Sequence, residues 1–387
     1  MLNQELISKE FDFLGDGIFL NVSQVGMPPK RVQDAYRSFM DNYIASYGMG
    51  MVPAAWDMVA ETRELVAELV NCEPHEVGFT KNTCEGVSIL ANGYPLKAED
   101  NVVIADQEHQ SVLFPWINMH EKIGLKLNVV KSIDGNIRTQ DMLDAIDENT
   151  KILIVSSAQF STGFRADLKT LGDECKKRGI IFAVDGIQTL GRYVMDVKEF
   201  NIDYLVAGTN KGLFGTLGAG FVYCSDRIVK DIIPPYAGYQ STMSHVAPPS
   251  VTTNFETLEW YPNARRFESG NLSYNCIYAI NKGISFLLEL GVENIQKQIE
   301  ELEEDLRNRL EGISLHVVTP ESAQHRSGII CVYYPANKDD EADKILKSKK
   351  IYCTMRGGYI RIGLDFYNTK EQMAVVADAL YEVAALK

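Results

Sequence analysis

Basic residues are scarce relative to acidic ones in this sequence of 387 residues. Lysine and arginine together number 38, against 52 aspartates and glutamates, which gives a formal net charge of −14. Proteins that bind nucleic acid depend on lysine and arginine to neutralise phosphates. The charge balance therefore argues against a nucleic-acid-binding protein.

Long apolar runs and paired cysteines are also missing. Nowhere do about 18 apolar residues follow one another, so we expect no membrane-spanning helix and no membrane partner. The first residues, MLNQELISKEFDF, include early acids and no apolar run of signal-peptide length. The seven cysteines form no CxxC pair and leave an odd count, which favours reduced thiols in a cytoplasmic protein.

Apolar runs and amphipathic segments alternate through the first two-thirds of the chain. NVVIAD at 101–106 and KILIVSS at 151–157 are nearly continuous apolar runs, typical of strands buried on both faces. The alternation predicts an α/β core with a largely parallel sheet. Besides those two strands, we expect helices at 53–70 and 166–179 and strands at 180–186, 202–208 and 219–226.

The pattern changes after about residue 235. Residues 236–254 form a connection rich in proline, serine and threonine, too long for a tight turn and therefore expected to be functional. We predict a large α/β domain over 17–255, and a small α+β domain from 1–16 and 256–387. In the small domain we expect helices at 274–290, 292–312 and 369–386 and strands near 326–334 and 358–364.

Three chemically distinctive residues follow predicted strands. Asp185 closes IIFAV, Lys211 follows YLVAG, and His109 follows NVVIAD. Each residue alone is weak evidence for a functional site, because a strand-end aspartate is commonly a helix cap and a single histidine is more often structural. Parallel sheets place ligands at the carboxyl ends of their strands, so the three together predict one shared ligand.

Pyridoxal 5′-phosphate requires this set of groups. Its aldehyde needs an amine for a Schiff base, which Lys211 supplies, and its pyridine nitrogen needs a carboxylate, which Asp185 supplies. His109 offers a flat ring that can stack on the cofactor. The stretch FTKNTCEGVSILANG offers a helix start for the phosphate, with Thr83 as the N-cap or a first-turn residue.

The run VDGIQTLGRYVMDVKEFNIDYLVAGTNKGLFGTLGAGFVY at 184–223 resembles the signature region of class V aminotransferases. That group includes cysteine desulfurases and isopenicillin-N epimerase-like proteins, which are fold-type-I pyridoxal phosphate enzymes with a mostly parallel seven-stranded sheet. The likeness extends over most of the chain through further motifs: WDMVAETRELVAELVNCEPHEVGFTKNTCEGV, EHQSVLFPW, FSTGFRADL, RRFESGN and YIRIGLDFYNTKEQ.

The resemblance implies a role for each matching residue. Lys211 carries the cofactor covalently, Asp185 pairs with the pyridine nitrogen and His109 stacks on the ring. Arg361, in YIRIG, matches the arginine that binds the substrate α-carboxylate, a role that suits the two parallel donors of a guanidinium. The remaining implied cofactor contacts are Gln188 with the phenolic oxygen and Thr83, Cys84, Asn210 and Asn271 with the phosphate.

Three positions depart from the family pattern. Asn210 stands where relatives have a histidine before the lysine, and Asn271 where they commonly have a threonine that reaches the neighbouring subunit's phosphate. Phe160 occupies a frequent asparagine position, for which Gln159 is a candidate substitute. The match of RRFESGN also implies a homodimer whose active sites lie at the subunit interface.

The reaction is constrained by a missing thiol. A cysteine desulfurase of this family carries a nucleophilic cysteine on a loop before the carboxylate arginine, and YCTMRGGYIRIG has no room for that loop. We interpret Cys353 as a structural cysteine in a strand. The prediction is an aminotransferase or C–S/β-lyase acting on a small L-amino acid. Epimerase or racemase activity, a desulfurase with a relocated thiol and a non-catalytic cofactor-binding scaffold remain alternatives.

Overall fold

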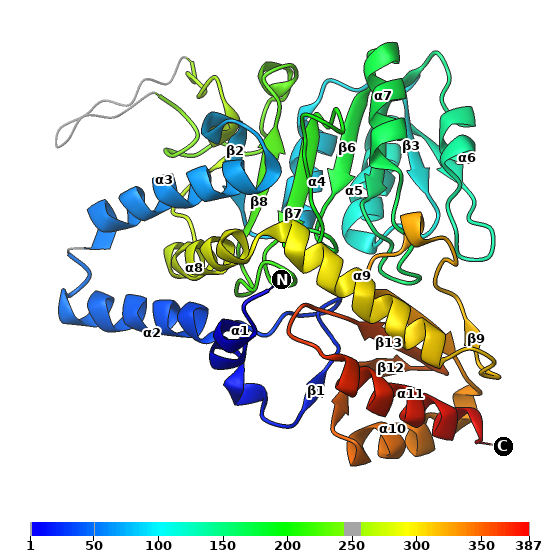
Figure 1. The fold of residues 1–387 in the computed structure, drawn as a ribbon. Helices are drawn as coiled ribbons and strands as arrows, with labels where there is room; N and C mark the ends of the chain where they lie inside the picture. Colours follow the sequence, from blue (N-terminus) through cyan, green and yellow to red (C-terminus); the bar gives the residue numbers. More distant parts are fainter. Residues whose placement is uncertain (1, 50, 244–256, 387) are drawn as a thin grey trace.

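The computed structural model describes residues 2–49, 51–243 and 257–386, and its centre is a seven-stranded sheet (Figure 1). The strand order is β2-β8-β7-β6-β5-β3-β4. The pairs from β4 through β7 are parallel, and β8 is antiparallel to both β7 and β2. The strands are β2 Val77–Thr80, β3 Asn101–Ala105, β4 Lys126–Val130, β5 Thr150–Ser156, β6 Ile181–Asp185, β7 Tyr204–Gly208 and β8 Gly220–Cys224.

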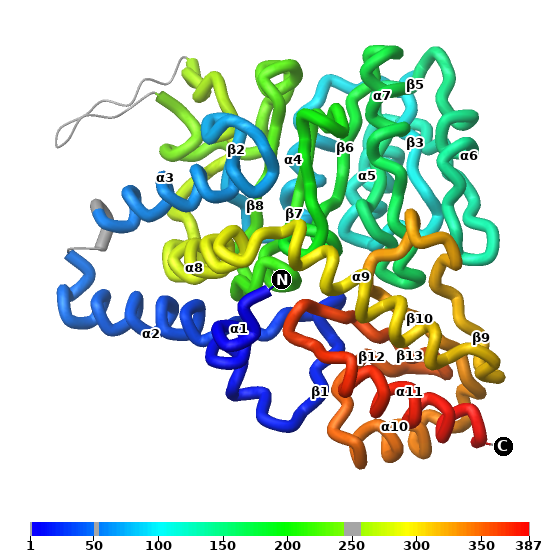
Figure 2. Tube along the Cα trace, viewed as in Figure 1, coloured from blue at the N-terminus to red at the C-terminus, as the bar shows by residue number. Residues whose placement is uncertain are grey.

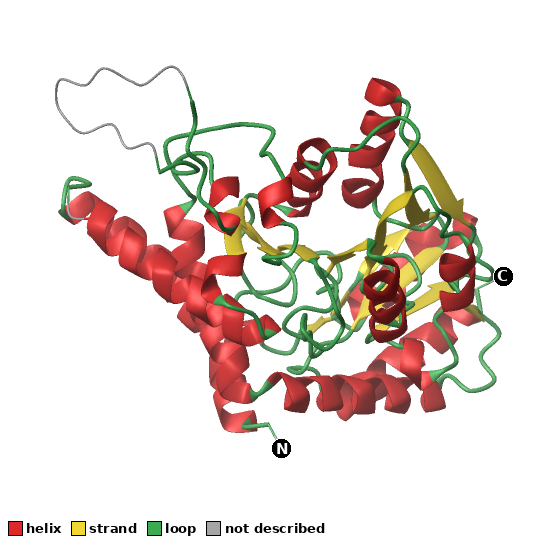
Figure 3. Ribbon diagram, turned by 90° about the horizontal axis from the view of Figure 1, so that it is seen from above, coloured by secondary structure: helices red, strands yellow, loops and turns green. Residues whose placement is uncertain are grey.

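Both faces of this sheet are buried, as the continuous apolar runs require. Along β5, Leu153 and Val155 pack into one apolar core while Ile152 and Ile154 pack into another on the opposite face. Helices cover the two faces, as Figure 3 shows from above. They include α4 Thr83–Gly93, α5 Gln110–Ile123, α6 Thr139–Asp144 and α7 Leu168–Arg178.

A smaller sheet follows in the second part of the chain. Its order is β12-β13-β10-β9, all antiparallel. Helix α9 packs against α11, and α10 also packs against α11. Figure 2 shows these three helices along the smaller sheet. The elements are α9 Val292–Arg309, β9 His316–Val317, β10 Ile329–Tyr333, α10 Asp339–Ser348, β12 Thr354–Arg356, β13 Tyr359–Gly363 and α11 Lys370–Ala384.

The N-terminal segment contacts both parts of the chain. After α1 Gln4–Glu10, strand β1 Ile18–Phe19 pairs in parallel with β11 Ile351–Tyr352. The chain then crosses to the large sheet, where the Gly26 amide donates to the Asn210 carbonyl at 2.8 Å. Helices α2 Lys30–Ala45 and α3 Met51–Val70 both pack against α8 Tyr274–Leu290.

The predicted fold class is confirmed, and the predicted strands and helices match the observed ones to within a few residues. The division into 17–255 and 1–16 with 256–387 remains a prediction, and one apolar core contains residues of both sheets. Much of the predicted functional connection at 236–254 lies outside the described residues. No helix in the described ranges is both long and apolar enough to cross a membrane.

Candidate active site

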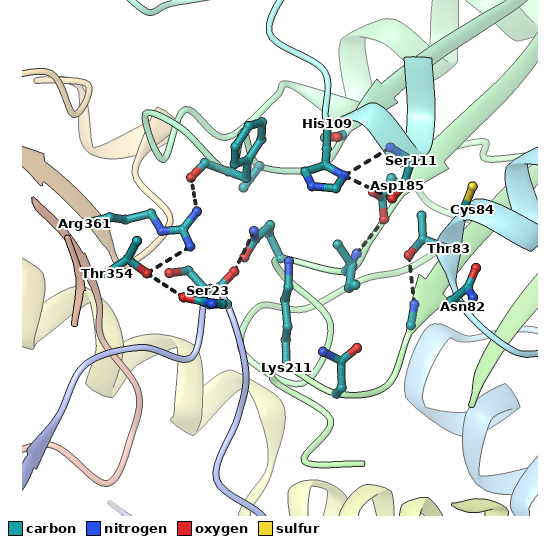
Figure 4. A pocket seen from close by; sticks show the side chains of 18 of the residues that line it. Ser23, Asn82, Thr83, Cys84, His109, Ser111, Asp185, Lys211, Thr354 and Arg361 are labelled. Carbon is teal, nitrogen blue, oxygen red and sulfur yellow. Dashed lines mark hydrogen bonds between the residues drawn. The ribbon is translucent and has the colours of Figure 1, made fainter. Parts of the chain in front are cut away.

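A cavity of about 800 Å³ lies where the carboxyl ends of β5, β6 and β7 face the smaller sheet. In Figure 4, Lys211 stands between Arg361 on one side and Thr83 on the other. The cavity brings together eight of the nine predicted site residues: Thr83, Cys84, His109, Asp185, Gln188, Asn210, Lys211 and Arg361. Asn271 does not line it; its side chain bonds to the Tyr239 hydroxyl.

Lys211 follows β7 by three residues, in a tight segment held by the N-terminal loop. A Cβ on Gly26 would lie 2.1 Å from the Lys211 carbonyl oxygen, so only glycine allows the two backbones to approach this closely. Burial lowers the pKa of the Lys211 ammonium to about 8, while the negative charge of Asp185 opposes the shift. A substantial fraction of the amine is therefore neutral near neutral pH and able to act as a nucleophile.

Asp185 is the last residue of β6 and is 2% exposed. One of its carboxylate oxygens accepts a hydrogen bond from the Ile187 amide at 3.0 Å. Burial raises the pKa of Asp185 to about 6, and the Lys211 charge acts in the opposite direction. This buried carboxylate would be stabilised by a protonated ring nitrogen inside the cavity.

The start of α4 provides unpaired amides beside the cavity. Asn82 is the N-cap, because its side chain accepts from the Glu85 amide at 2.9 Å. Of the two predicted roles for Thr83, the structure therefore gives the first-turn position. The amides of Thr83 and Cys84 have no preceding helical carbonyl to bind, which is the arrangement that binds phosphate.

His109 begins the helix that follows β3. Its Nδ1 accepts from the Ser111 amide at 3.1 Å, and its ring meets Phe160 edge-on at 5.0 Å. Burial lowers the pKa of His109, as do the charges of Lys211 and Arg361. A neutral, flat ring at the cavity wall is suited to stacking.

Gln188 contributes an unpaired buried oxygen. Its Nε2 donates to the Ser23 carbonyl at 3.1 Å, whereas Oε1 is buried with no partner among the described residues. A buried polar atom without a partner is costly unless a ligand satisfies it.

Arg361 is a buried guanidinium without a carboxylate partner in the described part of the chain. Its side chain donates to the Phe160 carbonyl at 2.8 Å and to Thr354 Oγ1 at 3.3 Å, and Nε is buried with no partner among the described residues. Arg361 is 7% exposed. Burying a cation without an anion is unfavourable, so the site is complete only when an anionic ligand is present.

Three further polar residues beside Arg361 were not among the predicted site residues. Ser23 and Gln24 line the cavity from the N-terminal loop, and Thr354 from β12. Residues 21–28 are distant from Lys211 in sequence. They reach the cavity because this loop crosses from the smaller sheet to the large one. The polarity of Asn21, Ser23 and Gln24 within an apolar segment was the available signal.

Two interpretations near the cofactor residues change with the structure. Gln159 does not line the cavity, because its Nε2 donates to the buried Glu108 carboxylate at 2.7 Å, whereas Phe160 does line it. Cys353 is not in a strand: it joins β11 to β12 and is one of the residues that line the cavity. Burial raises the pKa of the Cys353 thiol to about 12, which keeps it protonated at neutral pH.

These groups fit pyridoxal phosphate on observations of the chain itself. A desolvated amine, a buried carboxylate and unpaired helix-start amides converge on one cavity, and Gln188 adds an oxygen that lacks a partner. Lys211, Asp185 and the amides of Thr83 and Cys84 would hold its aldehyde, ring nitrogen and phosphate respectively.

Comparison with protein families gives a match over nearly the whole chain. The model described as "Aminotransferase class-V" matches residues 19–376. A "Probable cysteine desulfurase" of Methanothermobacter thermautotrophicus is 26% identical over 409 residues, covering 100% of this chain and 99% of that protein. An "Uncharacterized aminotransferase" of Schizosaccharomyces pombe is 28% identical over 330 residues, covering 84% of this chain and 82% of that protein.

Solved structures share the fold. The apo cysteine desulfurase of Thermococcus onnurineus superposes with a TM-score of 0.89 at 24% identity, covering 100% of this chain and 99% of that one. A cystine C–S lyase in complex with cysteine persulfide superposes with a TM-score of 0.87 at 19% identity, covering 96% and 99%.

We predict that Lys211 titrates near pH 8 in the cofactor-free protein. Replacing Asp185 by asparagine removes the anion that raises this pKa, so the pKa of Lys211 should fall further in Asp185→Asn. The measurement is the pH dependence of acetic anhydride labelling, read at each lysine by mass spectrometry. Lys198, whose pKa is raised by Glu73, is the internal control. Titration of Lys211 near 10.5, or an increase in Asp185→Asn, would contradict the prediction.

Proposed function

The chain belongs to the class-V aminotransferase family, and from that premise we propose that it is a pyridoxal phosphate-dependent C–S/β-lyase acting on an α-amino acid. The family is pyridoxal phosphate-dependent. The observation that carries the choice of substrate class is the buried Arg361 guanidinium, which faces the same cavity as Lys211 and lacks a carboxylate partner in the described residues.

The bound cofactor supplies an electron sink for the bonds at the substrate Cα. Arg361 would bind the α-carboxylate with two parallel hydrogen bonds and so fix the direction of the substrate. The Lys211 amine, with its pKa lowered to about 8, would accept the Cα proton and return it to a product atom. Its position between Asp185 and Arg361 keeps the amine close to both ends of the site (Figure 4).

Elimination without a protein thiol is supported by the chemistry of the cavity cysteines. In the net reaction the Cβ–S bond breaks, the thiol leaves with a proton, and water releases the remainder as pyruvate and ammonia. Cys353 is protonated because of its buried position, and Cys84 lies at the start of α4, on the opposite side of Lys211 from Arg361 (Figure 4). The relative named a probable cysteine desulfurase and the neighbour named a cystine C–S lyase support chemistry at a carbon–sulfur bond.

Aminotransferase activity is the second candidate, supported by the relative named an uncharacterized aminotransferase. Both reactions begin with proton removal at Cα, so they share Lys211 and Arg361. They differ in their products, because transamination retains the Cβ substituent in a keto acid and elimination releases it. A non-catalytic scaffold is disfavoured, since it needs neither an amine with a lowered pKa nor a carboxylate-binding arginine.

We predict that Arg361→Gln weakens amino-acid binding at least tenfold and leaves the absorbance of the bound cofactor unchanged. The reason is that an α-carboxylate whose charged partner has been removed loses on the order of 2–5 kcal/mol of binding free energy. Binding is measured by spectral titration of the holoenzyme with L-cysteine and S-methyl-L-cysteine, with assays for pyruvate, ammonia and keto acid. Unchanged affinity in Arg361→Gln would refute the carboxylate role.

We predict that Cys353→Ala and Cys84→Ala each retain turnover within about twofold, because neither thiol receives sulfur. Released sulfide or thiol should equal pyruvate in amount, and protein-bound persulfide should be undetectable by alkylation and mass spectrometry. Alanine formation from L-cysteine that disappears in either variant would instead show a desulfurase with a relocated thiol.

We also propose a homodimer, with Asn271 of each chain serving the site of the other. Large apolar side chains lie exposed on neighbouring helices, with Ile44 66% exposed and Trp56 58% exposed. Covering them in a second copy would remove apolar surface from water. Light scattering should give twice the mass of one chain, and Trp56→Glu should reduce that mass while Val375→Glu, on α11, does not. A fully active wild-type monomer would overturn this proposal.

A further inference from the structure

A second guanidinium lies on the same face of the smaller sheet as Arg361. In the antiparallel pair of β12 with β13, Thr354 is opposite Arg361 and Arg356 is opposite Tyr359. Side chains two residues apart on one strand share a face, so Thr354, Arg356 and Arg361 point the same way. Arg356 and Arg361 both line the cavity.

The Arg356 side chain has no hydrogen bond or ion pair to any described residue, although its backbone is held firmly. Gly357 and Gly358 turn the chain with φ of 58° and 78°, and their amides donate to Asp339 at 2.8 and 2.9 Å. Asp339 also accepts from the Tyr334 hydroxyl at 2.6 Å. The Asp339 carboxylate beside the turn therefore already accepts three hydrogen bonds. The exposed Arg356 side chain remains free to bind an anionic ligand.

The charge of the cavity points to an anion at this end. Among the described residues that line it, Asp185 is the single acid, against Lys211, Arg356 and Arg361. This concentration of positive charge occurs in a chain whose net charge is −14. Burial is the main cause that lowers the pKa of Arg361, and the Arg356 charge acts in the same direction, so the two guanidinium groups repel each other until anions neutralise them.

The N-terminal loop adds a neutral donor to the cavity wall, beside Thr354. Thr354 Oγ1 lies 3.0 Å from Gln24 Oε1, which leaves the Gln24 amide hydrogens without a described partner at the cavity wall. An amide donor beside guanidinium groups is well suited to a carboxylate or sulfinate oxygen.

We propose that Arg356 binds a second anionic group at the end of the substrate side chain. The substrate class is then α-amino acids whose side chain ends in a carboxylate or sulfinate, including S-conjugates of cysteine that carry a second carboxylate. Two residues along a strand span about 7 Å, which suits a side chain of several bonds between the two anions. The inference rests on the proposed function, because it takes Arg361 as the α-carboxylate site.

The test compares amino acids of nearly identical shape that differ in one charge. The wild-type holoenzyme is titrated with S-carboxymethyl-L-cysteine and its amide, S-carbamoylmethyl-L-cysteine, and with L-glutamate and L-glutamine. Binding is followed by absorbance and by calorimetry, and S-methyl-L-cysteine reports the α-carboxylate site alone. We expect the acid of at least one pair to bind at least tenfold more tightly than its amide.

Three variants assign that preference to Arg356. Arg356→Gln should remove the preference, of at least tenfold, by weakening the binding of the acid alone. Arg356→Lys should keep part of the preference. Arg138→Gln removes one positive charge from an exposed position outside the cavity and should change nothing.

The outcomes separate this inference from the proposed function. The role of Arg356 is overturned if the wild type binds acids and amides equally, or if Arg356→Gln weakens the binding of both equally. In either case, binding of S-methyl-L-cysteine leaves the proposed function intact. If no amino acid binds, S-methyl-L-cysteine included, both proposals fail.

Discussion

The buried guanidinium of Arg192 joins the two sheets and sets the geometry of the cavity between them. It donates to the Gln188 carbonyl at 2.9 Å, just beyond β6, and to the Leu364 carbonyl at 2.6 Å, just beyond β13. Arg192 is 1% exposed, and the carboxylates of Asp365 and Glu303 act on it electrostatically. Each buried carbonyl left unpaired would cost about 1–3 kcal/mol, so this side chain stabilises the position of the Arg361 strand relative to the Gln188 turn.

The same cation contributes to the chemistry of the cavity. Lys211 loses proton affinity chiefly because it is desolvated, and the charges of Arg361 and Arg192 lower its pKa further. Asp185 limits the shift because it favours the charged amine. The balance between one buried acid and several buried cations keeps the amine close to its working range, where it is both nucleophilic and able to carry a proton.

Much of this site could be predicted from the sequence, because strand ends are local features. Asp185 and Lys211 terminate or follow continuous apolar runs, and parallel strands bring their carboxyl ends to one edge whatever the details of packing. Contacts that depend on how the two sheets pack against each other could not be predicted from the sequence. Arg192 binding Leu364, and Gln159 turning to Glu108 rather than to the cavity, follow from tertiary packing that no local pattern encodes. Asn271 shows the same limit, since the site predicted for it would belong to a second chain.

The turn between β12 and β13 explains why the site has no loop for a thiol and why Arg356 lies at the cavity wall. Gly357 and Gly358 make the whole connection, and their positive φ angles reverse the chain within two residues. A Cβ on Gly358 would lie 2.4 Å from the Tyr334 carbonyl oxygen, so the turn is closely packed and cannot extend over the cavity without rearranging. A mobile thiol has no segment here to carry it. The tight turn instead keeps Arg356 at the cavity wall, on the same face as Arg361. One backbone constraint thus leaves no loop at this turn for a mobile thiol and, in the proposed function, holds the cation that would bind the substrate's far end.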